Sequence, residues 1–152
     1  MTANDNTFQN VVVAFDGSGD SVKAVRLACS IVSKFGSKLT VVHVYNSPAM
    51  VFAGGAGMPI PNYSELEDAA KGAATATLSK GVQTAGEYGV KARGELIEAP
   101  SVVEALVGFA TDQGVDLIVA GTRGMTGFKK LIMGSVTSGL VSHAHCPVLV
   151  VR

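Results

Sequence analysis

Apolar and polar positions alternate along this chain in two distinct patterns. Short apolar runs indicate buried strands, and stretches with apolar residues three or four apart indicate helices that cover a sheet. Strands are predicted over residues 11–15, 39–45, 90–97, 115–120 and 147–151. Helices are predicted between them, over 18–36, 64–88, 101–114 and 135–144. This alternation produces right-handed crossovers and therefore predicts an α/β fold with a parallel sheet and helices on both faces.

Residues suited to helix ends mark the starts of the predicted helices. Ser18 is expected as the N-cap of the first helix, and Gly36 as its C-terminal stop. The sequences Ser64-Glu-Leu-Glu67 and Ser101-Val-Val-Glu104 both have the spacing of a capping box. In a capping box the hydroxyl and the carboxylate satisfy N–H groups that have no partner inside the helix.

Two segments depart from the general pattern. Residues 46–62 hold three prolines and three glycines, so they can form neither a helix nor a central strand. Long loops in compact domains are often lids, and two interpretations of this segment stay open: a flexible, lid-like loop and a merely disordered loop. The strand over 90–97 is the least apolar of the five, which places it at an edge of the sheet.

The segment from Gly121 to Thr137 reads G-T-R-G-M-T-G-F-K-K-L-I-M-G-S-V-T and connects the fourth strand to the last helix. Gly121 and Gly124 are three positions apart, and Gly134 follows after nine further residues. Glycine lets a backbone approach a ligand closely. The free N–H groups at the start of a helix favour an anion, and Ser135 is expected at the N-cap. These features predict a phosphate site.

The charges of this segment agree with a phosphate site. It carries Arg123, Lys129 and Lys130 and no acidic residue. Arg123 can either clamp a phosphate or remain solvated, and both interpretations stay open. The two lysines are interpreted as surface charges. The alternative for the whole segment is a glycine-rich connection that binds nothing.

The pattern G-x-x-G, nine residues, then G-S resembles the nucleotide loop of the universal stress protein family, in its ATP-binding branch. The closing segment His143-Ala-His-Cys-Pro-Val-Leu-Val-Val151 also resembles the last helix and strand of that family. The resemblance implies one Rossmann-like domain over residues 1–152, with an open five-stranded sheet in the strand order 3-2-1-4-5. In such a sheet, ligands bind where the strand order reverses. The loops that begin at Asp16 and Gly121 flank that point.

The resemblance also implies which residues bind ATP. Asp16 would contact the ribose or a Mg²⁺ ion held by the nucleotide, unless it serves only to form the turn. Ala14 stands where the family often has proline and leaves room for an adenine. The backbone of Val44 would hold the adenine edge. The phosphates would be surrounded, mainly by backbone N–H groups, by Gly121, Arg123, Gly124, Gly134, Ser135, Val136 and Thr137.

Several functions compete for this sequence. The leading one is an ATP-binding regulatory protein of the stress response, with slow ATP hydrolysis at most. The second is an enzyme that hydrolyses ATP or adenylylates a substrate, because Asp16-Gly-Ser-Gly-Asp-Ser21 is similar to the S-G-G-x-D-S loop of PP-loop ATPases, although the leading S-G-G is missing. The third candidate is a receiver domain that accepts a phosphoryl group. Such a domain would need an acidic pair after the first strand and a lysine after the last, and this chain has neither. Stress proteins that only bind partners lose the glycine motif that this chain keeps.

Composition limits the partners and the location. Apolar residues make up 47% of the chain and charged residues 16%, which suits a sheet buried on both faces. The formal net charge is zero, so nothing indicates a nucleic-acid partner. No apolar run approaches the roughly 20 residues of a membrane span, and the N-terminus has no signal-peptide pattern. Two cysteines form no disulfide framework, so a cytoplasmic location is expected.

The histidines and cysteines are interpreted as structural. His143 and His145 are two positions apart, so they project about 200° apart on a helix, and a fourth metal ligand beside Cys146 is not evident. His43 lies among apolar residues of a strand and is expected in the core or the crevice. Cys29 is expected to be a core thiol.

The last predicted strand, from Pro147 to Val151, is short and strongly apolar. An exposed edge of this kind would invite uncontrolled pairing with other chains. In the family this edge pairs with its copy in a two-fold dimer, so the resemblance implies a homodimer through this strand. The sequence does not identify a protein partner.

Overall fold

The computed structural model describes residues 7–49, 61–122 and 133–152. Most of the predicted lid-like segment therefore lies outside the described residues. The same holds for Arg123, Gly124, Lys129 and Lys130 of the glycine-rich segment.

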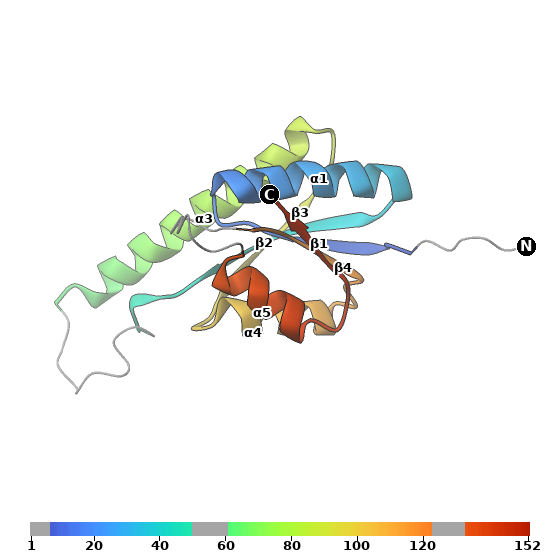
Figure 1. Ribbon diagram of the computed structural model, residues 1–152. Coiled ribbons are helices and arrows are strands. Elements are labelled where there is room, and N and C mark those ends of the chain that lie inside the picture. The colour runs from blue at the N-terminus through green and yellow to red at the C-terminus, as the bar shows by residue number, and fades with distance from the viewer. Residues whose placement is uncertain (1–6, 50–60, 123–132) are drawn as a thin grey trace, which may run out of the picture.

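Five parallel strands form one sheet in the order β3-β2-β1-β4-β5. Helices α1 and α3 cover one face of the sheet, and α4 and α5 cover the other (Figure 1). This arrangement confirms the expected fold class and strand order. The elements are β1 (Asn10–Ala14), α1 (Gly19–Phe35), β2 (Lys38–Tyr45), α3 (Tyr63–Glu87), β3 (Arg93–Glu98), α4 (Val102–Asp112), β4 (Leu117–Gly121), α5 (Ser135–His143) and β5 (Val148–Val151).

Strand β1 is buried on both faces of the sheet. Val11 and Val13 point into the core below α1 and α3, whereas Val12 points into the core below α4 and α5. All three are at most 1% exposed. Burial on both faces explains why this strand is an unbroken apolar run instead of an alternating one.

Three predicted helix ends are confirmed. Ser18 Oγ accepts a hydrogen bond from Ser21 N at 3.2 Å at the start of α1, and Ser101 Oγ accepts one from Glu104 N at 3.3 Å at the start of α4. Gly36 ends α1 with a φ of 68°, a backbone conformation that glycine adopts without steric cost.

The start predicted for α3 is wrong. The helix begins at Tyr63, and its N-cap is Asn62, which has a φ of 61° and makes no side-chain capping bond. Asparagine tolerates this left-handed conformation better than most residues. Glu67, the expected acid of the capping box, instead accepts a hydrogen bond from the Tyr63 hydroxyl at 2.9 Å. The Tyr63–Glu67 pair therefore replaces the box expected between Ser64 and Glu67.

Other boundaries also differ from the sequence expectation, and β4, for example, starts at Leu117, two residues later than predicted. The N-cap of α5 is Gly134, and Ser135 is the first helical residue. Strand β3 starts at Arg93, three residues later than predicted. Val90 and Ala92 pack against the core ahead of the strand, and the pairing with β2 begins at Arg93. Its expected position at an edge of the sheet is confirmed.

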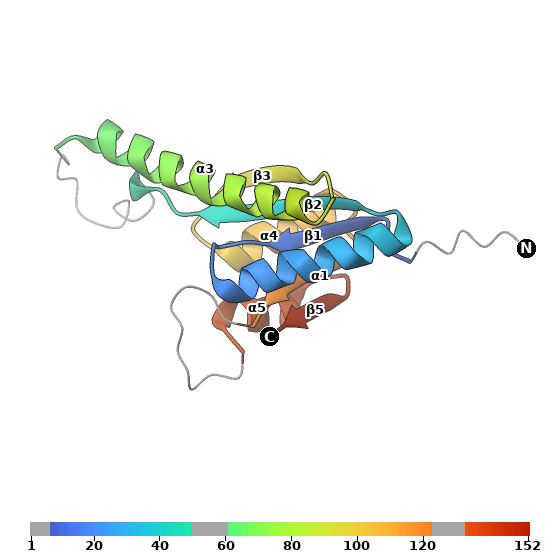
Figure 2. The same cartoon turned by 90° about the horizontal axis from the view of Figure 1, so that it is seen from above.

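Helix α3 extends beyond the sheet at its N-terminal end and is packed closely near its C-terminal end (Figure 2). A Cβ atom on Gly81 would lie 2.8 Å from Phe15 Cδ1 and 2.8 Å from Val41 Cγ1. Real side chains do not approach this closely, so Gly81 is a packing residue. A Cβ on Gly72 of the same helix would meet nothing within 4 Å. None of the described helices is long and apolar enough to cross a membrane.

We predict that Gly81→Ala lowers the free energy of unfolding by about 1–2 kcal/mol, because overpacking outweighs the better helix propensity of alanine. Gly72→Ala is the matched control and should raise it by about 0.5–1 kcal/mol, since only the propensity changes. Urea denaturation of the three proteins checks both values. Equal shifts for the two variants would contradict the close packing at Gly81.

Candidate functional site

A cleft opens past the carboxyl ends of β1 and β4, where the strand order reverses. The sequence places the expected site at this point of the sheet, and the described members of that site do line one cleft. Its lining consists of Ala14, Phe15, Asp16, Ser18, Ser21, Val42, His43, Val44, Val102, Leu106, Ala120, Gly121, Gly134, Ser135, Val136 and Thr137.

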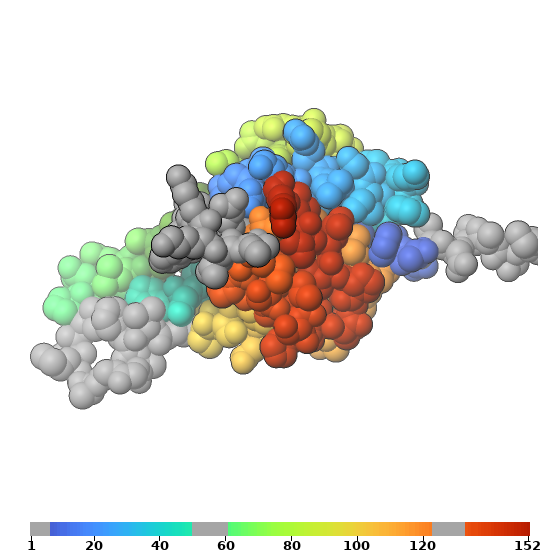
Figure 3. Space-filling model, viewed as in Figure 1, coloured from blue at the N-terminus to red at the C-terminus, as the bar shows by residue number. Residues whose placement is uncertain are grey.

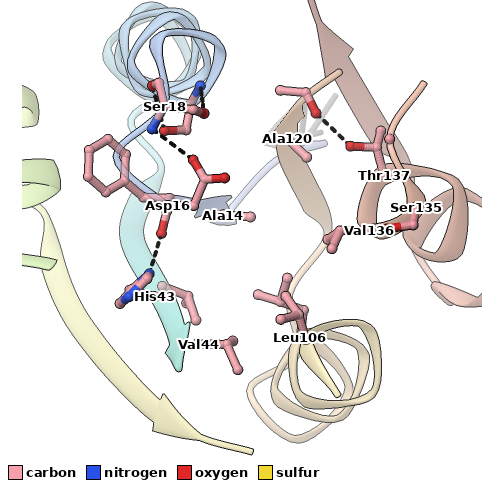
Figure 4. A pocket seen from close by; sticks show the side chains of 16 residues that line it. Ala14, Asp16, Ser18, His43, Val44, Leu106, Ala120, Ser135, Val136 and Thr137 are labelled. Atoms are coloured by element: carbon pink, nitrogen blue, oxygen red, sulfur yellow. Dashed lines mark hydrogen bonds between the residues drawn. The ribbon is translucent and has the colours of Figure 1, made fainter. Parts of the chain in front are cut away.

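One half of the cleft is apolar. Figure 4 shows the side chains of Ala14, Val44, Leu106 and Val136 directed toward a common space. They come from β1, β2, α4 and α5 respectively. An apolar slot of this kind suits a flat, weakly hydrated group better than a charged one.

The backbone of Val44 adds polar groups to this apolar half. Phe15 N donates to Val42 O at 2.9 Å just where β1 ends. Alternate residues of a strand turn their backbone groups the same way, so Val44 directs its N–H and C=O toward the same side. Because β1 has ended at Ala14, these two groups face the crevice, and they present a donor and an acceptor side by side.

The start of α5 forms the polar half of the cleft. The first intrahelical bond runs from Ser138 N to Gly134 O at 2.9 Å. The N–H groups of Ser135, Val136 and Thr137 precede that bond, and no backbone acceptor for them lies among the described residues. These groups and the positive end of the helix dipole favour an anion. Gly134 N, in contrast, donates within the protein, to Thr122 O at 2.6 Å.

Asp16 lies at the mouth of the cleft and forms a turn. Its Oδ1 accepts a hydrogen bond from Ser18 N at 2.9 Å, which is the turn-forming role considered from the sequence (Figure 4). The residue is partly buried and lines the cleft, so it also places a negative charge there. The two roles are compatible because the turn uses one carboxylate oxygen.

Close packing within the protein requires glycine at position 121. A Cβ on this residue would lie 2.8 Å from both the carbonyl carbon and the Cβ of Asp20. The end of β4 therefore packs directly on the first turn of α1. Close approach of a ligand, which the sequence suggested, is not needed to explain this glycine.

The sequence analysis did not identify some residues of the cleft. Val102 and Leu106 are one turn apart on α4 and close the apolar half from below the sheet. Their helical spacing was a usable signal, since residues four apart on a helix share a face. Asp20 and Thr122, which hydrogen-bond beside the cleft, carry no such local signal.

The histidines have structural partners. His43 Nδ1 lies 2.7 Å from Phe15 O, and because a carbonyl only accepts, the ring nitrogen donates. His43 thus stiffens the crevice wall, as its expected position there suggested. His143 Nδ1 donates to Gly139 O at 2.9 Å, and His145 Nδ1 lies 3.2 Å from Thr111 Oγ1.

The cysteines are shielded from solvent to different extents. Cys29 is 2% exposed, and burial raises the pKa of its thiol, which confirms a core residue. Cys146 is partly buried, and burial together with the nearby Asp116 carboxylate raises the pKa of its thiol as well. Both thiols are therefore poor nucleophiles near neutral pH.

Comparisons with known proteins agree with the observed fold. Residues 7–152 match the profile of the universal stress protein family. A universal stress protein of Methanocaldococcus jannaschii is 34% identical over 149 residues, which cover 97% of this chain and 84% of the relative. The universal stress protein YxiE of Bacillus subtilis is 30% identical over 148 residues, covering 95% and 99%.

Solved structures agree with these relatives. The universal stress protein UspA from Lactobacillus plantarum is 25% identical, with a TM-score of 0.75 and coverage of 95% of this chain and 98% of that one. A universal stress protein crystallised in complex with cAMP is also 25% identical, with a TM-score of 0.67 and coverage of 95% and 97%. Since the family profile spans residues 7–152, this chain belongs to the universal stress protein family.

Proposed function

We propose that this protein binds an adenine nucleotide, with ATP as the principal ligand, and acts as a nucleotide-dependent regulatory protein of the stress response. One observation carries the proposal: an apolar slot and the free N–H groups of α5 meet in one crevice, at the reversal of the strand order. A nucleotide has the matching halves, a flat base and an anionic phosphate chain. The relative in complex with cAMP supports an adenine nucleotide as the ligand class.

The proposed pose follows from the two halves of the cleft. The adenine would lie among Ala14, Leu106 and Val136, with its edge on the backbone N–H and C=O of Val44. The ribose would lie near Asp16. The phosphates would lie at the N–H groups of Ser135, Val136 and Thr137, with Gly121 and Gly134 framing them and Arg123 and Gly124 as further proposed contacts outside the described residues.

We propose a binding role in preference to catalysis. Phosphoryl transfer needs an oriented nucleophile as well as stabilisation of the phosphate charge. The α5 N–H groups supply charge stabilisation. Asp16 is the acidic residue among the described residues of the cleft, and the imidazole of His43 already donates to Phe15 O. ATP is therefore expected to remain bound, with slow hydrolysis at most, and its occupancy would alter the affinity for a protein partner.

The proposed function predicts selectivity for adenine. Adenine offers an acceptor at N1 and a donor at its amino group, which match the N–H and C=O of Val44, whereas guanine offers the reverse pair. Calorimetry should show ATP binding at least about tenfold tighter than GTP, the size expected for mismatched hydrogen bonds. Mass spectrometry of protein purified without added nucleotide should find an adenine nucleotide. Absence of any nucleotide binding in folded protein would refute the function.

A further prediction concerns Asp16 and Mg²⁺. In Asp16→Asn the amide oxygen can still accept from Ser18 N, so the turn is kept and only the charge is removed. If the carboxylate helps to hold a nucleotide-bound Mg²⁺, ATP affinity should fall about tenfold in Mg²⁺ and stay unchanged or rise in EDTA, where one negative charge less faces the phosphates. Asp16→Ala is the comparison that also loses the turn. Equal losses with and without Mg²⁺ would leave Asp16 only the ribose role.

We further propose a homodimer through the edge strand from Pro147 to Val151. β5 ends the sheet, and residues 133–152 form much of the face turned to the viewer in Figure 3. The carbonyls of Pro147 and Val151 accept hydrogen bonds from N–H groups of β4 and its extension. Alternate residues face opposite edges, so the N–H and C=O of Val150 face outward. These are the groups that a second copy would pair with.

This assignment makes Val150→Pro the sharpest test of the dimer. The substitution removes an outward N–H and leaves the bonds to β4 in place, so it should release monomers without unfolding the protein. Val150→Ala keeps that N–H and is the matched control. Light scattering and thermal unfolding of the three proteins check the result. An unsubstituted protein that is monomeric at micromolar concentration would contradict the interface.

A further inference from the structure

Thr122 joins three parts of the fold at the base of the segment between β4 and α5. It is 4% exposed and follows the last residue of β4. Its N–H donates to Val151 O at 2.8 Å, and its carbonyl accepts from Gly134 N at 2.6 Å. Its hydroxyl donates to Asp20 Oδ2 at 2.9 Å. The two described ends of the segment are thereby held together and tied to both β5 and α1.

The Asp20 carboxylate interacts mainly with Thr122. Its other oxygen, Oδ1, lies 3.6 Å from Lys23 Nζ, but the Lys23 side chain is 58% exposed, so this ion pair is weak. The Asp20 side chain is only 19% exposed, and the residue lies in the first turn of α1, where the helix dipole favours a negative charge. Direct packing of its backbone on Gly121 fixes its position further.

An acid beside a phosphate site needs a physical explanation. A carboxylate repels a phosphate, so Asp20 would weaken anion binding if it acted through its charge alone. Its acceptor oxygen is instead occupied by the Thr122 hydroxyl, and Thr122 in turn holds Gly134, the N-cap of α5. Thr137 Oγ1 donates to Gly121 O at 2.5 Å and ties the first turn of α5 to the same strand end. The Asp20 carboxylate is thus linked to the start of α5 through Thr122.

We propose that Asp20 is a positioning residue for phosphate recognition: through Thr122 it fixes the start of α5, so that the N–H groups of Ser135, Val136 and Thr137 converge on the phosphate chain. This inference rests on the proposed nucleotide function and refines it. The contribution concerns the phosphates of the ligand more than its base, because Ala14, Val44 and Leu106 of the apolar half come from β1, β2 and α4, whereas Val136 comes from α5. Affinity for ATP and affinity for adenosine should therefore respond differently.

The test compares ATP and adenosine on the same proteins by calorimetry. Thr122→Val keeps the shape of the side chain and removes the hydroxyl, and Thr122→Ser keeps the hydroxyl and serves as the matched control. We expect Thr122→Val to lower ATP affinity about tenfold, the usual effect of losing a hydrogen bond to a charged group, and to leave adenosine affinity within about twofold. Thr122→Ser should retain the preference for ATP over adenosine.

Asp20→Asn separates positioning from metal binding. The amide oxygen can still accept from Thr122, so ATP affinity should stay at the unsubstituted level or rise in EDTA and in Mg²⁺ alike. A loss seen only in Mg²⁺ would make Asp20 a metal ligand and overturn the positioning role. Equal losses of ATP and adenosine in Thr122→Val, or no loss of either, would also overturn it. If the unsubstituted protein binds ATP no more tightly than adenosine, the proposed phosphate site itself fails, which is a distinct result.

Discussion

Burial of β1 on both faces and both edges is the constraint on which the other elements depend. β2 and β4 pair with its two edges, and helices from the two halves of the chain cover its two faces. The chain leaves β1 toward α1 on one face, whereas it leaves β4 toward α5 on the other. The two connections therefore lead to helices on opposite faces, and the crevice beside the strand ends is a direct consequence of the strand order. The core needs the strands in this order whether or not a ligand binds.

The crevice combines features that the fold requires with features that the fold does not use. Gly121 is required by the first turn of α1, and Gly134 donates its N–H to Thr122. Asp16 shapes a turn and also leaves a charge at the mouth of the cleft. The features that remain for the proposed ligand are the backbone groups that face the cleft, those of Val44 and of the start of α5. A glycine motif alone thus says less about binding than the direction of the neighbouring N–H groups.

The sequence predicts whatever depends on local patterns. Unbroken apolar runs located the buried strands, and the hydroxyls of Ser18 and Ser101 located two helix starts because capping acts within four residues. The capping box at Ser64 failed because the helix starts earlier, at Tyr63 with Asn62 as the N-cap, so Ser64 lies inside the first turn and Glu67 accepts from the Tyr63 hydroxyl instead. The Asp20–Thr122 bond joins residues 102 positions apart, so only the folded sheet brings the two together. The strand order came from family resemblance, since periodicity does not distinguish one order from another.

The pairing of β1 with β4 also determines when the crevice exists. Because these strands are distant in sequence, their pairing requires the closure of a long loop. A ligand held by both loops has no site in a chain that lacks this pairing. Such a ligand binds only the folded chain and therefore raises the free energy of unfolding. Occupancy of the crevice would then lower the fraction of globally opened chains, and with it the exposure to proteases that act on such chains.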